Sequence, residues 1–130
     1  MREIKFQCIY RPTKEKFFPH YIDFINTIVV GNFNGVIGNW RHFSSEPSGY
    51  GDVWLRQYTG LKDINGREIY KGDVYHQGDP NILYVVEYKG ASFVGKQIGS
   101  SSYAGLEHWK GRIEVIGEVY RNPDLLEAAE

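Results

Sequence analysis

The sequence has one cysteine, almost no net charge and no long hydrophobic run in its 130 residues. A single thiol excludes an intrachain disulfide framework and is typical of a reducing compartment. The N-terminal stretch MREIKFQCIY carries charges within its first five residues and lacks the apolar core of a signal peptide. No run approaches the roughly 18 apolar residues that a membrane helix needs. We therefore expect a cytoplasmic protein that does not bind a membrane.

The formal net charge of −1 also argues against one class of partner. An extended nucleic-acid surface normally comes with a marked excess of Lys and Arg. Nucleic-acid binding would therefore need a local basic patch, and it is possible here without being favoured.

Motifs for common catalytic and metal-binding chemistry are missing as well. There is no HExxH, CxxC or GxSxG pattern, and Cys8 has no partner at metal-ligand spacing. We expect no cofactor, no bound metal and no catalytic residue. Four histidines lie far apart along the chain, and each is more typical of a solvated or core position than of a zinc ligand: His20, His42, His76 and His108.

Aromatic residues and glycines are abundant, at 15% and fifteen residues respectively. Together with short alternating segments, they predict a mainly β protein with many turns, folded as a small barrel or roll. The turn-rich stretch 44–52 divides the chain. We expect an N-terminal β segment over residues 1–52 and a C-terminal domain over residues 53–130.

Two N-terminal segments read as strands. Residues 3–10 alternate, with Ile4, Phe6, Cys8 and Tyr10 on one face, which predicts a half-buried strand with Cys8 pointing inward. Residues 21–30 fit either a helical face or two short strands around a turn. Their β-branched side chains favour the strands.

The stretch from Leu55 to Asp79 carries Gly60, Gly66 and Gly72 at regular six-residue intervals. It fails the templates of a phosphate loop and of an EF-hand calcium loop. Turns explain the glycines better. We expect Gly60 to close a strand, Asn65-Gly66 to form a type I′ hairpin and Gly72 to precede the next strand.

Further along, residues 82–88 predict a central strand, and a second strand follows after a glycine turn. Residues 99–105 read as a flexible loop. Residues 111–120 alternate as a strand in which Gly117 indicates a bulge. From Asn122 onward, the Asn-Pro-Asp sequence predicts a short helical turn.

Two aromatic-basic segments, NWRHF and EHWKGR, are candidate contact surfaces. Trp40 beside Arg41, and Trp109 beside Lys110, could stack on bases or grip a peptide. The alternative is that both tryptophans belong to the core while their neighbours reach solvent. The second interpretation is favoured, since an aromatic-rich β core needs such residues.

Four pieces of the chain resemble the YopX family of phage and prophage proteins. They are MREIKF, LRQYTGLKDINGREIYKGDVY, VVEYKGASF and IEVIGEVYRNPDLLE, in that order. Two departures occur: FQCIY stands where the family commonly has an Arg and a Trp, and residues 17–51 have no counterpart. The resemblance implies an SH3-type β-barrel or roll from about Trp54 to Asn122, with an accompanying β layer formed by the N-terminal strands. It implies no enzymatic activity.

These patterns favour a non-catalytic binding or assembly module of the bacterial host cytosol, with a protein partner or with itself as a homo-oligomer. An alternative is a small hydrolase or nuclease-like enzyme that uses Asp63, Asp73, Glu87 and His76. Another is a nucleic-acid-binding accessory protein. The candidate partner-binding residues are Lys62, Asp63, Arg67, Tyr70, Asp73, Trp40, Arg41 and Trp109.

Overall fold

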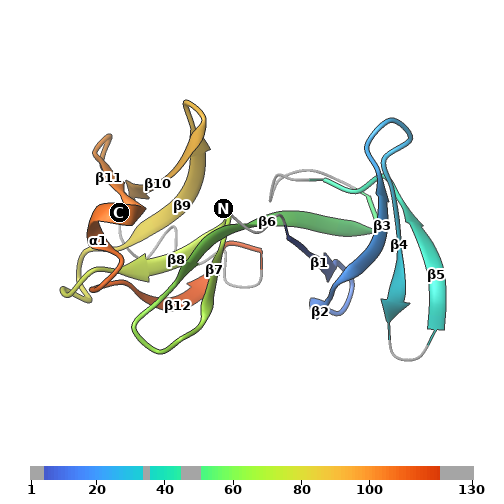
Figure 1. Cartoon of the computed structure of the whole chain (residues 1–130), viewed down its shortest axis with the longest axis horizontal. Coiled ribbons are helices and arrows are strands. Elements are labelled where there is room, and N and C mark those ends of the chain that lie inside the picture. The colour runs from blue at the N-terminus through green and yellow to red at the C-terminus, as the bar shows by residue number, and fades with distance from the viewer. Residues whose placement is uncertain (1–4, 34–35, 45–50, 121–130) are drawn as a thin grey trace. The chain divides into compact units, whose positions relative to one another are not determined.

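The computed structural model describes residues 5–33, 36–44 and 51–120. These residues form strands and one short helix, which confirms the mainly β class (Figure 1). No helix among them has the length and apolar character needed to cross a membrane. The elements are β1 (Phe6–Tyr10), β2 (Glu15–Phe17), β3 (Pro19–Asp23), β4 (Ile28–Phe33), β5 (Val36–Arg41), β6 (Val53–Lys62), β7 (Glu68–Tyr70), β8 (Asp73–His76), β9 (Tyr84–Lys89), β10 (Ser92–Gln97), β11 (Tyr103–Gly105), α1 (Leu106–Trp109) and β12 (Glu114–Glu118).

The chain forms two compact units that divide within β6, between Gln57 and Tyr58. The first half of β6 pairs with β1, and the second half pairs with β7. The N-terminal unit covers residues 5–57, and the C-terminal unit begins at Tyr58. Each has a hydrophobic core of its own.

In the N-terminal unit, residues 21–30 form two strands, as their β-branched composition predicted. β3 and β4 are antiparallel neighbours in the sheet β3-β4-β5, joined by a turn over residues 24–27. Asp23 holds this turn: Oδ2 accepts from the Asn26 side chain at 2.8 Å, and Oδ1 accepts from the Ile25 and Asn26 amides. The Asn26 side-chain hydrogen bond, with the backbone bonds, lowers the pKa of Asp23 below its usual range.

Strand β1 is buried on both faces, so the prediction of a half-buried strand was wrong. Cys8 and its neighbour Ile9, which point to opposite faces, are both fully buried. Gln7 is buried as well, and its Oε1 accepts a hydrogen bond from Arg56 Nε at 2.8 Å. The polar Gln7 therefore does not mark a solvent-exposed face of β1, because Arg56 on β6 satisfies its side-chain oxygen. Burial raises the pKa of the Cys8 thiol to about 12, which keeps it protonated and inert at neutral pH.

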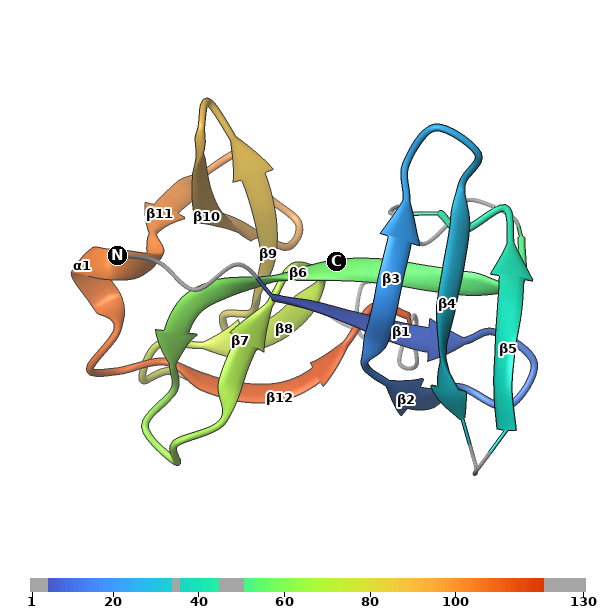
Figure 2. The ribbon, with the colours of Figure 1, turned by 45° about the vertical axis from the view of Figure 1, so that its right-hand side comes forward.

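The C-terminal unit is built on an antiparallel sheet in the order β11-β10-β9-β8-β12. Figures 1 and 2 show it strongly curled, with β9 and β10 rising away from β8 and β12. β9 lies in the middle of this sheet, as the apolar run predicted. An SH3-type closure of the curled sheet stays a prediction. The buried core residues are Ile69, Tyr75, Val86, Phe93, Leu106, Ile113 and Val115.

The end of the C-terminal unit departs from expectation in two places. The segment predicted as a flexible loop contains β11, which pairs with β10. It leads into the unpredicted helix α1, whose Leu106 is 1% exposed. Four residues are too few to produce a helical periodicity in a sequence. The predicted bulge is confirmed between Val115 and Gly117, whereas the helical turn expected from Asn122 onward lies outside the described residues.

The turn between β6 and β7 is not the predicted type I′ hairpin. Asp63 and Arg67 close a three-residue loop, with the Asp63 amide donating to the Arg67 carbonyl at 2.8 Å. Within this loop only Gly66 has a positive φ, of 79°. That geometry is a type I turn followed by a left-handed glycine. Asp63 selects it, because its Oδ1 accepts the Asn65 and Arg67 amides at 2.9 Å each. β6 also continues past Gly60 to Lys62, so the prediction that this glycine closes the strand was wrong.

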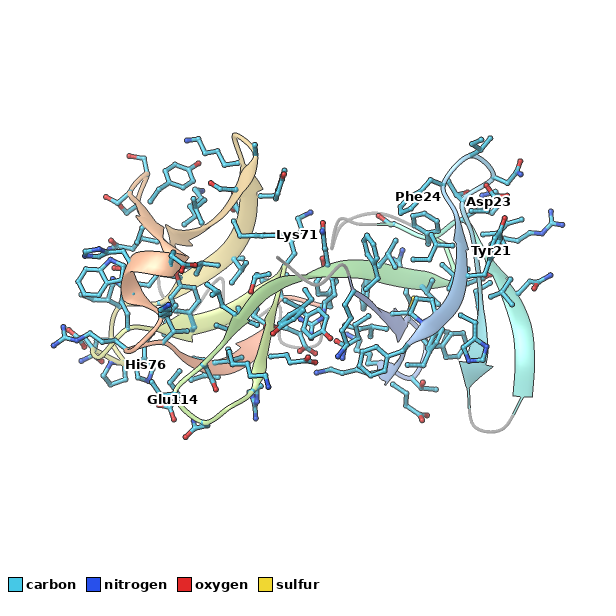
Figure 3. All side chains as sticks on the ribbon, viewed as in Figure 1. Tyr21, Asp23, Phe24, Lys71, His76 and Glu114 are labelled. Atoms are coloured by element: carbon cyan, nitrogen blue, oxygen red, sulfur yellow. The ribbon has the colours of Figure 1, made fainter. Side chains whose placement is uncertain are left out.

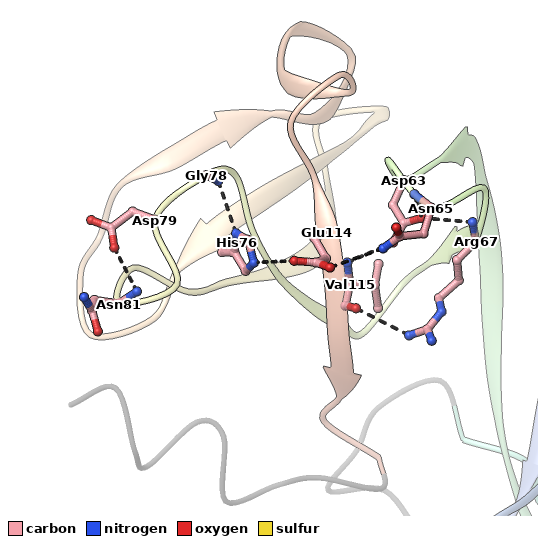
Figure 4. A network of polar contacts seen from close by, with 9 residues as sticks. All are labelled: Asp63, Asn65, Arg67, His76, Gly78, Asp79, Asn81, Glu114 and Val115. Atoms are coloured by element: carbon pink, nitrogen blue, oxygen red, sulfur yellow. Dashed lines mark hydrogen bonds and ion pairs between the residues drawn. The ribbon is translucent and has the colours of Figure 1, made fainter.

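The same turn closes the open edge of β12. Asp63 Oδ2 accepts the Val115 amide at 3.0 Å, and Arg67 Nη1 lies 3.4 Å from the Val115 carbonyl oxygen (Figure 4). The Ile64 amide donates to the Ile113 carbonyl at 2.9 Å. We call this set of contacts the Asp63 clamp. It supplies partners to backbone groups that an edge strand would otherwise leave open.

The backbone of Gly72 lies between the backbones of Val86 and Val119 in the C-terminal unit, with little space around it. Its amide donates to the Val86 carbonyl at 2.9 Å, and its carbonyl accepts from the Val119 amide at 3.0 Å. Its φ is +89°, and a Cβ there would lie 2.3 Å from the Tyr120 ring. Two independent constraints therefore require glycine at this position.

Replacing Gly72 with alanine should lower the free energy of unfolding by about 3 kcal/mol, from the left-handed φ and from the clash with Tyr120. Gly66→Ala is the matched control, since Gly66 has a similar φ and nothing within 4 Å of its added Cβ. It should cost about 1–2 kcal/mol. Urea denaturation measures both, and equal losses would show that the Tyr120 contact does not constrain Gly72.

Removing the Asp63 carboxylate should also destabilise the fold. Asp63→Ala leaves three backbone amides without their acceptor and should cost about 3 kcal/mol in urea denaturation. Asp63→Asn keeps one carbonyl oxygen for the turn but places an NH₂ group against the Val115 amide. Hydrogen exchange should then quicken at Val115 while the turn amides stay protected. Unchanged protection of Val115 in Asp63→Asn would contradict the clamp.

Candidate functional site

The residues predicted to bind a partner lie in separate places. Lys62 is exposed at the end of β6, while Asp63 is buried in its clamp and the exposed Arg67 contacts Val115. Tyr70 and Asp73 are buried at the β7–β8 turn, where Asp73 Oδ2 accepts the Tyr70 amide at 2.7 Å. Internal contacts thus account for most of the charged side chains in this stretch. Their role in binding stays a prediction.

Trp40 and Arg41 do not share a surface. The Trp40 ring packs against Phe17 in the N-terminal core, with ring centroids 4.8 Å apart. Arg41 is the next residue on β5, so its side chain takes the opposite face and is exposed. Its amide donates to Asp52 Oδ2 at 2.7 Å. An aromatic and a cation adjacent in sequence are separated here by the pleat of the strand.

Two residues of the hydrolase alternative hold backbone groups. Asp63 and Asp73 accept backbone amides, whereas Glu87 is a residue of β9 whose backbone pairs with Val94. The described part of the chain contains no group of three His, Cys, Asp or Glu residues placed to hold a metal ion. This geometry gives the hydrolase alternative no support.

His76 ends β8 and contacts β12. Its Nε2 lies 2.9 Å from Glu114 Oε1, and its Nδ1 accepts the Gly78 amide at 3.2 Å (Figures 3 and 4). A backbone amide can only donate, so Nδ1 carries a lone pair and the proton is on Nε2. Asn65 Nδ2 donates to the other oxygen of Glu114 at 3.2 Å. Both ring nitrogens of His76 are therefore engaged in hydrogen bonds in this arrangement.

A cavity of about 180 Å³ opens on the C-terminal unit beside this histidine. Two of its residues, Trp109 and Arg112, come from the end of α1 and the turn after it. Gln77, Asp79 and Ile82 lie on the segment between β8 and β9, which we call the pocket loop (residues 77–83), and Tyr84 is the first residue of β9. The lining residues are Gln77, Asp79, Ile82, Tyr84, Trp109 and Arg112.

The two aromatic side chains that line the pocket, Tyr84 and Trp109, pack against other residues of the C-terminal unit. Tyr84 stacks on the fully buried Tyr75, with ring centroids 5.4 Å apart and an angle of 18°. Trp109 packs against the core. The Arg112 amide donates to the Trp109 carbonyl at 2.8 Å, and the guanidinium lies 5.9 Å from the indole ring centroid. The indole therefore already faces a cation.

The polar part of the pocket contains both acceptors and donors, among them the Asp79 carboxylate and the Arg112 guanidinium. Gln77 Nε2 lies 3.4 Å from the Tyr84 hydroxyl, and Gln77 Oε1 is buried without a hydrogen-bond partner among the described residues. Asp79 Oδ1 accepts the Asn81 amide at 2.9 Å, which orients the carboxylate on its loop. A buried acceptor without a donor is unfavourable by about 1–3 kcal/mol. The pocket is therefore suited to a group that brings N–H donors.

Sequence reasoning found only part of this pocket. The segment EHWKGR drew attention to Trp109 and Arg112, and the unpredicted helix and its following turn bring these two residues together. Gln77, Asp79 and Tyr84 carried no signal, because ordinary loop and strand residues are indistinguishable from site residues without the fold.

Comparisons with known proteins agree with this fold. The family model described as YopX protein matches residues 15–127, which confirms the resemblance carried by the Leu55–Asp79 stretch. The match includes residues 17–51, so the expectation that they have no counterpart in the family was wrong. The structure is similar to the crystal structure of protein EF1440 from Enterococcus faecalis, with a TM-score of 0.61 and 21% identity over 97% of this chain and 99% of that chain. At that identity the likeness shows the fold alone. None of the curated proteins compared with the chain matches it significantly. Because the family model covers most of its length, the chain belongs to the YopX family.

Proposed function

We propose that this protein is a non-catalytic binding module, of phage or prophage origin and acting in the bacterial host cytosol. Its pocket takes up one Lys or Arg side chain of a partner protein. The observation that carries the proposal is the buried, unpartnered Gln77 Oε1 in a pocket whose walls are the rings of Trp109 and Tyr84.

The donor-rich side chains of Lys and Arg match this lining in three ways. Their N–H groups supply the donor that Gln77 Oε1 lacks. Their charge complements the Asp79 carboxylate, and aromatic faces attract such cations. A cavity of about 180 Å³ accommodates one side chain and not a folded surface. Arg112, the one cation in the lining, would have to swing away from Trp109, and its long, exposed side chain allows that.

Selection of a random peptide library on the full chain tests this proposal. Peptides enriched in Arg or Lys are expected, and their affinity should fall about tenfold in Trp109→Ala and several-fold in Asp79→Asn. Asp79→Asn keeps the acceptor for the Asn81 amide, so it removes charge without breaking the loop. Arg112→Ala should strengthen binding, because it removes a competing cation.

Tyr103→Ala is the control, since Tyr103 is an exposed aromatic residue outside the pocket. Its affinity for the selected peptides should match that of the unchanged chain. Enrichment of acidic peptides, or weaker binding in Arg112→Ala, would contradict a cationic ligand. Retention of single-stranded oligonucleotides at low salt, lost in Trp109→Ala, would instead favour the nucleic-acid alternative.

Self-association also remains part of the proposal, and the β3–β4 hairpin is the place to test it. Tyr21, Phe24 and Ile25 are 59%, 60% and 93% exposed. Figure 3 shows Tyr21 and Phe24 on this hairpin. Exposed apolar clusters of this kind mark contact surfaces. Light scattering should show a dimer or larger species that Ile25→Asp dissociates, while Ile116→Asp, at an exposed isoleucine of β12, should not. A monomer at all concentrations would exclude self-association.

A further inference from the structure

The side chain of His76 contacts both strand β12 and the pocket loop. On one side its Nε2–H donates to Glu114 on β12, and on the other its Nδ1 accepts the amide of Gly78. Gly78 stands between Gln77 and Asp79, two of the polar residues of the pocket. Its φ of +122° is one that side-chain-bearing residues rarely adopt. The position of both pocket residues therefore depends on the conformation that His76 helps to hold.

The two sides of the ring respond differently to a proton. Glu114 accepts from Nε2–H whether the imidazole is neutral or charged, so that contact persists in both states. The contact with Gly78 does not, because Nδ1 accepts only while it is unprotonated. A proton taken from solvent forms an N–H bond at Nδ1, which then faces the amide N–H of Gly78. Two donors now oppose each other, and the hydrogen bond between them is lost.

We propose that His76 is a proton-operated latch on the pocket loop: the neutral ring holds Gly78 and keeps the pocket formed, and protonation releases it. This regulation rests on the function proposed above for the same pocket. Glu114 is the charged group that contacts the ring from β12, and its own second oxygen is held by Asn65. The other charged groups on the segments around it are Asp63, Arg67 and Asp79.

The direction of the pH effect follows from the acceptor role of Nδ1, which only an unprotonated ring nitrogen can have. Ligand binding should be strong at about pH 8 and weak at about pH 5, the range over which imidazoles titrate. The loop should loosen over the same range.

Nitrogen-15 NMR of the full chain tests the latch without any ligand. At pH 8, the ring nitrogens of His76 should report the Nε2–H tautomer. On acidification, the Gly78 amide should lose about three- to tenfold of its exchange protection, after correction for intrinsic rates, in step with the protonation of His76. Protection of Gly78 that does not follow His76 would overturn the proposal.

His76→Asn is the matched variant. An Asn side-chain oxygen can accept the amide two residues on, as Asp79 does with Asn81 in this same loop, and it does not titrate. Gly78 should then stay protected at both pH values. A transition at Gly78 that survives in this variant would assign the switch to another group and overturn the latch.

The peptides selected above, rich in Arg or Lys, separate the latch from the binding function. Their affinity should drop about three- to tenfold from pH 8 to pH 5 in the unchanged chain and stay constant in His76→Asn. If no peptide binds at any pH and the Gly78 transition still occurs, the proposed function fails and the latch stands. If the peptides bind equally at both pH values and Gly78 stays protected, the latch fails and the function stands.

Discussion

The Asp63 carboxylate is the group on which the C-terminal unit depends. One side-chain oxygen shapes the turn between β6 and β7, and the other reaches across to the backbone of β12. A curled sheet that ends at β12 would leave the amide and carbonyl of Val115 open, and Asp63 with Arg67 meets both. The adjacent Ile113 and Val115 side chains belong to the core. The polar contact at the edge and the apolar packing behind it therefore support the same strand.

This constraint explains why the segment that identifies the family is rich in glycine and charge without being a binding loop. Asp63 and Asp73 are buried and accept backbone amides, while Gly72 passes between the Val86 and Val119 backbones against Tyr120. Residues fixed by such contacts have little freedom to change their position for a ligand. The neighbouring pocket loop is held at its own turns, where the Gly78 amide donates to His76 and the Asn81 and Ile82 amides donate to Asp79.

Much of the fold could be predicted from the sequence, because strand alternation and turn chemistry are local. β9, the Gly117 bulge and the two strands of residues 21–30 follow from such patterns. The failures came from side-chain partners and from an element, α1, that is too short to leave a pattern. Gln7 on β1 can be buried because Arg56 donates a hydrogen bond to its side chain. The Asp63 side chain stabilises a three-residue loop where a type I′ turn was expected. The pocket could not be predicted beyond Trp109 and its neighbours, because it joins two segments separated by more than twenty residues.

The hydrogen bonds of the Asp63 clamp and of His76 also bear on the chemistry that is open to the C-terminal unit. General acid–base catalysis needs a side chain with a free lone pair or a transferable proton facing a cleft. In the network of Figure 4 the carboxylates accept backbone or side-chain N–H groups, and both nitrogens of His76 are engaged. The residues that line the cavity are of a different kind: the aromatic Trp109 and Tyr84, the apolar Ile82, the amide Gln77, the exposed Asp79 and the exposed Arg112. Such a lining is consistent with the binding role proposed above. His76 contacts both the polar network and the pocket loop. The lone pair on its Nδ1 links the protonation state of the ring to the conformation of the pocket loop.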